Sequence, residues 1–173
     1  MLFVKGDEKE VYEFRNSPLN NEHLKHSSLL SFHHKRTEYS VGDCFVSDNE
    51  SECIYQITTL FYKTTHTFHP TLHMRCATFM KYSVFYVRNS HLRRINGPNT
   101  RYEYIQLQDT QELTPDQIEE KAFISRPNDW HKDKRNSYFC RFFYNGNDLV
   151  PYTPFMAKFC DPFVENGTIF FIY

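Results

Sequence analysis

Three histidines lie close together in the middle of the chain: His66, His69 and His73. Imidazole is a common zinc ligand, and spacings of this kind occur in metal sites. Pro70 lies between the second and the third, and it interrupts any helix that would place all three on one face. We therefore interpret them as solvated histidines around a hairpin loop, and we predict no metal site and no cofactor.

Short motifs of nucleophilic and phosphate chemistry are missing from the sequence. It contains no GxSxG elbow, no glycine-rich phosphate loop and no HExxH helix. Its 5 glycines offer little backbone that could approach a nucleotide closely. These features favour a protein that is not an enzyme and has no small-molecule substrate.

A basic segment without a single acidic residue spans residues 86–102. Because the formal net charge of the whole chain is only -1, any affinity for phosphates must come from a local patch such as this one. Arginine suits such contacts, since its planar head carries five donors. The segment predicts contact with phosphates or with an acidic protein surface, and a solvated loop without a partner is the alternative. Its candidate residues are Arg88, Arg93, Arg94 and Arg101.

The cysteines are odd in number, scattered and never spaced as CxxC: Cys44, Cys53, Cys76, Cys140 and Cys160. This pattern indicates reduced thiols in an intracellular protein rather than a disulfide framework. Charges at Lys5 and Asp7 interrupt what would be the apolar core of a signal peptide. No window approaches the ~20 apolar residues of a membrane span. We expect a soluble intracellular protein without membrane contact.

The composition favours one mainly β domain. Of its 173 residues, 40% are hydrophobic and 17% aromatic, and aromatic rings pack well across neighbouring strands. Residues 1–36 are polar and predict an amino-terminal arm packed on a domain formed by residues 37–173. Alternating patterns predict strands, of which the third is too long to stay flat. Residues 39–46 alternate, with Gly42-Asp43 as a turn that enters the first strand, and residues 145–148 predict a turn after a later strand. The other expected strands are residues 54–62, 72–86, 104–107, 138–144 and 168–173.

One short helix is expected at residues 114–121. Thr114 can act as its N-cap, Pro115 occupies the first helical position, and Gln117 is placed to complete a capping box. Acidic residues follow in the first turns, where the helix dipole favours them.

Several of these stretches together resemble the framework of a bromo-adjacent homology (BAH) domain. The resemblance covers about residues 38–160 and begins with residues 39–46 and 54–57. Residues 103–105, followed by Asp109 and then residues 118–124, are similar to the family's acidic-led strand, acidic loop and short helix running into the next strand. The aromatic run at residues 137–144 resembles a late strand of the family, and Val150-Pro151 falls where the family often closes that hairpin.

A finer resemblance is to the amino-terminal BAH domain of the largest subunit of the origin recognition complex and its silencing relatives. Tyr12-Glu13-Phe14 with Pro18-Leu19 is similar to that subunit's lead-in segment, and residues 78–82 resemble its central strand. The resemblance implies a distorted, mainly antiparallel β-barrel with short helices, and a nuclear role in chromatin, in DNA replication or gene silencing.

Many BAH domains bind a methylated lysine through an aromatic cage, because ring faces attract a quaternary ammonium. Tyr55 matches one cage position, but the expected tryptophan falls on Thr78, and further positions fall on Met80 or Tyr82, Val84 and Leu107. One ring of three or four predicts a degraded cage. The partner-binding candidates that the resemblance implies are Tyr55, Phe79, Met80, Tyr82 and Asp109.

The resemblance and the missing cage together predict a non-catalytic module that docks a chromatin protein, a histone or a nucleosome through loop surfaces. Two alternatives remain open. The first is a histone-tail reader that recognises methyl-lysine. The second is a module that makes a weak nucleic-acid contact through the arginines of the basic segment.

Overall fold

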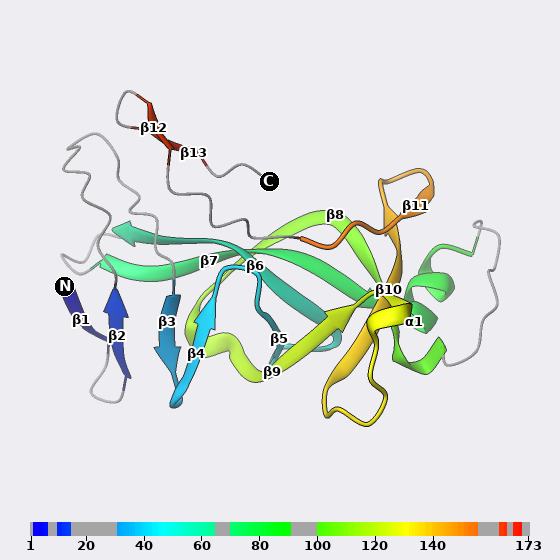
Figure 1. Cartoon of the computed structure of the whole chain (residues 1–173), viewed down its shortest axis with the longest axis horizontal. Helices are drawn as coiled ribbons and strands as arrows, with labels where there is room; N and C mark the ends of the chain where they lie inside the picture. Colours follow the sequence, from blue (N-terminus) through cyan, green and yellow to red (C-terminus); the bar gives the residue numbers. More distant parts are fainter. Residues whose placement is uncertain are drawn as a thin grey trace.

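The computed structural model describes the backbone of residues 2–6, 10–14, 31–64, 70–90, 100–155, 163–165 and 168–170 (Figure 1). It describes side chains within residues 31–62, 71–90 and 101–155.

A closed barrel forms the body of the described chain. Its sheet has the order β11-β10-β8-β7-β6-β5-β9, and β10 also pairs with β9, so six strands close into a ring and β11 extends it. Closure gives each ring strand two neighbouring strands, each over part of its length. The predicted mainly antiparallel barrel is confirmed, although β10 runs parallel to both of its ring neighbours, β8 and β9. The strands are β5 (Cys44–Ser47), β6 (Glu50–Thr64), β7 (Pro70–Lys81), β8 (Glu103–Leu113), β9 (Ile118–Ser125), β10 (Ser137–Tyr144) and β11 (Leu149–Pro151).

The barrel interior is filled by one buried side chain or more from each ring strand. Phe79 of β7 is fully buried there and meets the ring of Tyr152 edge-on, with the centroids 5.8 Å apart. This interior cluster contains Cys44, Ile54, Ala77, Phe79, Tyr104, Ala122, Cys140 and Tyr152.

Two further layers cover the outside of the barrel. The hairpin β3 (Ser31–His34) and β4 (Thr37–Ser40) contributes Phe32 and Tyr39, whose rings stack 5.6 Å apart, to a cluster with side chains of β5, β6 and β7. Toward the other end of the molecule (Figure 1), the helix α1 (Tyr82–Arg88) packs its buried side chains against Ile105 of β8.

The predicted arm is described only in part. The strands β1 (Leu2–Gly6) and β2 (Glu10–Phe14) form an antiparallel hairpin, while residues 15–30 lie outside the described chain. Within residues 31–36, Phe32 and His34 are buried. The boundary at residues 36 and 37 stays a prediction. A second short hairpin joins β12 (Phe163–Glu165) to β13 (Thr168–Phe170), where a strand was expected.

Two predictions of secondary structure were wrong. The strand expected over residues 72–86 ends at Lys81, and the remainder forms α1. Tyr82 and Phe85 lie three residues apart, so one helical face buries both rings.

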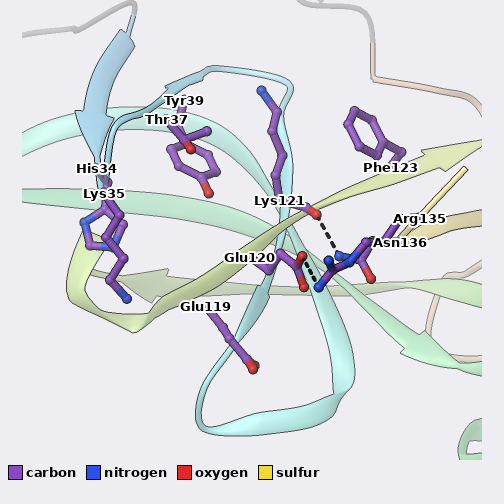
Figure 2. A pocket seen from close by; sticks show the side chains of 10 residues that line it. All are labelled: His34, Lys35, Thr37, Tyr39, Glu119, Glu120, Lys121, Phe123, Arg135 and Asn136. Atoms are coloured by element: carbon purple, nitrogen blue, oxygen red, sulfur yellow. Dashed lines mark hydrogen bonds and ion pairs between the residues drawn. The ribbon is translucent and has the colours of Figure 1, made fainter.

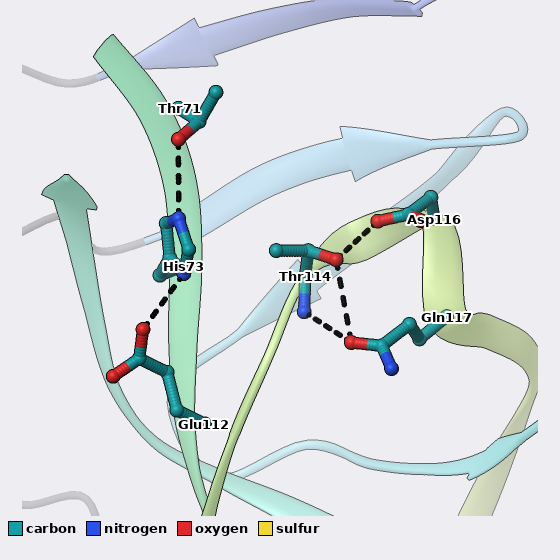
Figure 3. Close-up of polar contacts among 6 residues, drawn as sticks. All are labelled: Thr71, His73, Glu112, Thr114, Asp116 and Gln117. Atoms are coloured by element: carbon teal, nitrogen blue, oxygen red, sulfur yellow. Dashed lines mark hydrogen bonds and ion pairs between the residues drawn. The ribbon is translucent and has the colours of Figure 1, made fainter. Parts of the chain in front are cut away.

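The helix expected over residues 114–121 is a single 3-10 turn, Pro115–Gln117, followed by β9. The local capping contact does form, because the backbone N–H of Thr114 donates to Gln117 Oε1 at 2.9 Å (Figure 3). From Ile118 to Ala122, pairing with β5 overrides the helical preference, and the strand then continues with residues 123–125 paired to β10.

Candidate functional site

An irregularity in the sheet builds the candidate site. In the ladder between β7 and β8, Ala77 pairs with Thr110 but Phe79 pairs with Gln106, so residues 107–109 stand opposite the single residue Thr78. Such bulges bend a strand and re-aim its side chains, and they are common beside functional sites. Here the bulge lifts Leu107, Gln108 and Asp109 toward α1.

The bulge, α1 and the turn after β10 enclose a groove of about 230 Å³, which we call the bulge groove. Its walls are mostly apolar, and the rings of Phe85 and Tyr144 meet edge-on with centroids 5.1 Å apart. The groove is lined by Met80, Phe85, Arg88, Asn89, Leu107, Gln108, Asp109, Tyr144 and Gly146.

Two opposite charges lie on the bulge groove. Arg88 and Asp109 are both exposed. The guanidinium of Arg88 contacts the sulfur of Met80, with Nη1 3.9 Å from Sδ, and a thioether is a weak acceptor. Within the described part of the chain, no ion pair is formed by either Arg88 or Asp109. Both charges are therefore available to a partner.

The turn at one end of the groove is tightly fitted. The hydroxyl of Tyr144 donates to the carbonyl oxygen of Gly146 at 2.7 Å. Gly146 has a φ of 95°, which favours glycine, and a Cβ at this position would lie 3.1 Å from Oε1 of Gln108. The predicted turn at residues 145–148 is confirmed by the hydrogen bond from Asn145 N to Asp148 O at 3.1 Å.

A buried ion pair links β8 to β10 next to the groove. Glu103 is fully buried, and it accepts two hydrogen bonds from Arg141: Nε to Oε1 at 2.6 Å and Nη2 to Oε2 at 2.8 Å. The hydrogen bonds to Glu103 raise the pKa of Arg141, and Tyr82 and Tyr86 of α1 interact electrostatically with the same guanidinium. The pair therefore sits between the barrel wall and the helix that borders the groove.

The structure brings three predicted site residues together at the bulge groove, while the other predicted residues that it describes lie elsewhere. Met80, Arg88 and Asp109 line the bulge groove, together with Leu107, one of the cage positions that the resemblance implied. Phe79 points into the barrel interior, which follows from the alternation of side chains along a strand.

Tyr55 and Tyr82 are each only 4% exposed. The hydroxyl of Tyr55 donates to Glu50 Oε2 at 3.0 Å, and Thr78, at the position expected for a tryptophan, is its cross-strand partner. The ring of Tyr82 packs against the ring of Tyr86, with the ring centroids 4.5 Å apart. None of these rings lines the bulge groove.

Most of the basic segment lies outside the described residues, including Arg93 and Arg94. At its far end, the guanidinium of Arg101 lies 4.8 Å from the ring centroid of Tyr102. The contribution of the basic segment to binding stays a prediction.

A second, larger groove of about 340 Å³ lies between β9 and the β3–β4 hairpin (Figure 2). Its charged residues differ in their partners: Lys35 donates to the carbonyl oxygen of Ile118 at 3.4 Å, and Glu119 forms no ion pair with a described residue. Lys121 pairs with Asp43 at 3.1 Å, and Arg135 pairs with Glu120 at 2.8 Å. The bulge groove differs in that neither of its two charged residues, Arg88 and Asp109, forms an ion pair with a described residue.

His73 is the one member of the histidine cluster that the structure describes, and it is held by its neighbours (Figure 3). Its Nδ1 is 2.9 Å from Glu112 Oε1, and its Nε2 is 3.1 Å from Thr71 Oγ1. A hydroxyl, an imidazole and a carboxylate in this order are the parts of a nucleophilic triad, but neither groove described above includes any of them. The described residues contain no group of three side chains able to hold a metal ion.

The cysteines within the described chain are buried and free: Cys44, Cys53, Cys76 and Cys140. Burial raises the pKa of Cys44 and of Cys140 to about 12, so both remain neutral thiols at physiological pH. Both pack as small hydrophobic side chains in the barrel interior. Cys160 lies outside the described residues.

Sequence reasoning missed Phe85, Gln108 and Tyr144 as groove residues. The sequence predicted a strand that ends at Tyr144 and a turn that contains Gly146. No local sequence pattern indicates that this turn lies beside the end of a helix. The excess of residues that forms the bulge becomes visible only when β7 and β8 are paired.

No protein-family model matches this sequence, and no curated protein matches it. Among solved structures, the chain is similar to the crystal structure of the yeast Rsc2 BAH domain, with a TM-score of 0.47 and 15% sequence identity. The match covers 70% of this chain and 52% of the Rsc2 chain, so this chain spans about half the length of the Rsc2 chain in that structure. Within the described residues, no helix has the length and apolar character needed to cross a membrane.

Proposed function

We propose that this protein is a non-catalytic, chromatin-associated interaction module that docks a nuclear protein through the bulge groove. The observation that carries the proposal is an apolar groove on a closed barrel with two opposite charges, Arg88 and Asp109, that no described residue neutralises. Interfaces use such apolar centres with charged rims. The chromatin setting rests on the BAH resemblance of the sequence.

The side chains of the bulge groove support binding rather than catalysis. The groove is lined by no serine, cysteine, histidine or lysine; of the side chains that could act as an acid, base or nucleophile it contains Asp109 and Tyr144, and the hydroxyl of Tyr144 donates to Gly146. Two of the positions that would form a methyl-lysine cage are occupied by the buried Tyr55 and Thr78, and Met80 and Leu107, which line the groove, supply no ring, so docking of a protein is favoured over reading of a methylated tail.

A pull-down with the full chain tests the proposal. The immobilised protein is offered intact nucleosomes, free histones and free DNA, each at low and high salt. We expect retention of nucleosomes or of a histone, with a clear loss for the double variant Arg88→Gln/Asp109→Asn. The matched control is Lys132→Gln/Asp133→Asn, which alters one exposed cation and one exposed acid on a loop away from the groove.

Each outcome decides between the alternatives. Equal retention of nucleosomes and free DNA, with affinity falling steeply as salt rises, would favour the nucleic-acid contact and contradict protein docking. Retention that is insensitive to the groove variant, or no retention at all, would contradict the proposed role of the groove.

A further inference from the structure

We propose that the bulge groove binds an extended peptide segment with one large apolar side chain, a basic residue on one side of it and an acidic residue on the other. This inference rests on the proposed function and specifies its ligand. The apolar side chain would lie among Met80, Leu107 and Tyr144, with the basic residue at Asp109 and the acidic residue at Arg88.

The size of the bulge groove fits one side chain. At about 230 Å³ it is smaller than the roughly 300–1,000 Å³ of sites for drug-sized ligands. Its floor is apolar, since Met80 and Leu107 belong with Phe85 and Tyr144 to the hydrophobic cluster under α1. An aliphatic or aromatic side chain buried there would gain the most from leaving water.

The arrangement of charges indicates a ligand with both signs. Arg88 is the last residue of α1, whereas Asp109 belongs to the bulge of β8, so the two charges come from different elements that border the groove. No ion pair joins them in the described structure. A ligand with one charge would match only half of this site and would meet repulsion at the other half.

The backbone of the bulge suggests an extended ligand. Leu107 pairs with Tyr144 of β10, but Gln108 and Asp109 pair with no residue of β7 or β10 in the ladders of the sheet. Strand segments whose N–H and C=O groups lack a ladder partner can pair with an added peptide strand. Both residues are exposed.

The same geometry disfavours methyl-lysine. Phe85 is only 1% exposed, which leaves Tyr144 as the single ring able to present surface to a ligand in this groove. The guanidinium of Arg88 would repel a quaternary ammonium. We therefore expect no preference for a methylated lysine over an unmodified one.

A peptide library tests the inference. The probe is a library of terminally blocked heptapeptides with a fixed central leucine or phenylalanine and mixed residues elsewhere, with cysteine omitted. The full chain should select peptides with acids on one flank and bases on the other. Arg88→Gln should remove the acidic preference alone, and Asp109→Asn the basic preference alone, each weakening the best peptide by about 3- to 10-fold.

Controls separate the inference from general charge effects and from the proposed function. Lys132→Gln and Asp133→Asn should leave selection unchanged. Absence of selection, flank preferences unaffected by the groove variants, or tighter binding of a trimethyl-lysine peptide would overturn the inference. Retention of nucleosomes in the pull-down, with groove dependence, would in that case leave the proposed function standing.

Discussion

Replacing Arg141 with leucine is expected to destabilise the barrel strongly. Its partner Glu103 is fully buried and receives both of its short hydrogen bonds from this guanidinium, at 2.6 and 2.8 Å. Removal of the cation leaves a buried carboxylate without compensation, which costs about 3–5 kcal/mol in comparable pairs. The reverse change, Glu103→Leu, should cost less, because the side chain of Arg141 is 26% exposed and can reach water.

The double variant Glu103→Leu/Arg141→Leu isolates the pair itself. Replacing both charges with apolar groups is often close to neutral, so the double variant should be more stable than Arg141→Leu alone. Arg135→Leu is the matched control, since Arg135 also pairs with a glutamate, at 2.8 Å, but its side chain is 84% exposed. Exposed pairs contribute about 0–1 kcal/mol.

Urea unfolding followed by circular dichroism measures these differences. With a slope of about 2 kcal/mol per molar urea, the midpoint of Arg141→Leu should fall by roughly 2 M, while that of Arg135→Leu should fall by less than about 0.5 M. A loss below about 1 kcal/mol for Arg141→Leu, or a double variant whose loss equals the sum of the single losses, would refute the reasoning.

Three further changes follow from single contacts. Thr114→Ala should lower the free energy of unfolding by about 1 kcal/mol because it removes the side chain at the cap of the turn after β8; Thr114→Ser should restore most of it, and equal stability of all three proteins in urea would contradict this role. Thr78→Val should leave the free energy of unfolding unchanged or raise it by about 1 kcal/mol, because the buried Oγ1 of Thr78 has no hydrogen-bond partner among the described residues; a clear loss in thermal unfolding would show that the hydroxyl has one. Above pH 9, the free energy of unfolding should fall as pH rises toward 12, because the unfolded chain loses thiol protons that the native state retains. The expected fall is about 1.4 kcal/mol per pH unit for each such thiol. A Cys160→Ser variant that shows thiolate absorbance at pH 10 while folded would contradict the raised pKa values, about 12, of Cys44, Cys53 and Cys140.

The strands were predictable wherever alternation and aromatic content were strong. Residues 138–144 lie in β10, residues 54–62 lie in β6, and Gly42, predicted to be in a turn, has a φ of 98°. Alternation shows that a segment is a strand but contains no information on its neighbours. The position of β10 between β8 and β9, parallel to both, could not be predicted because it depends on contacts far apart in the sequence.

The two wrong assignments have opposite physical causes. Residues 82–86 are rich in aromatic and β-branched side chains that favour strands, yet burial of Tyr82 and Phe85 on one face stabilises a helix. Residues 118–121 follow a helix start with a capping contact, but they pair with β5, and the next residues of the same strand, 123–125, pair with β10. In both segments tertiary packing outweighs local preference, and a single sequence does not report that balance.

The candidate site was only half predictable for a related reason. Met80, Arg88 and Asp109 were singled out from the sequence, and they do meet at one groove. Tyr55 and Phe79 were singled out with them, but their side chains are buried in the core. A pattern of residue types along a strand does not distinguish the face that packs inward from the face that meets solvent when both faces are apolar.

The bulge follows from the demands of both faces of β7. Ala77 and Phe79 must point into the barrel, and Met74 and Cys76 must point into the outer cluster that the β3–β4 hairpin covers. The register of β7 is therefore fixed by both of its faces. Across the ladder, Ile105 is held in the cluster under α1 and Leu113 in the outer cluster near the β3–β4 hairpin. The residues of β8 between these two anchors exceed those of β7, and the excess must leave the ladder. A one-residue deletion at Gln108 would shift one anchor to the wrong face or open the ladder. The position of the groove is therefore a consequence of how β7 and β8 pair.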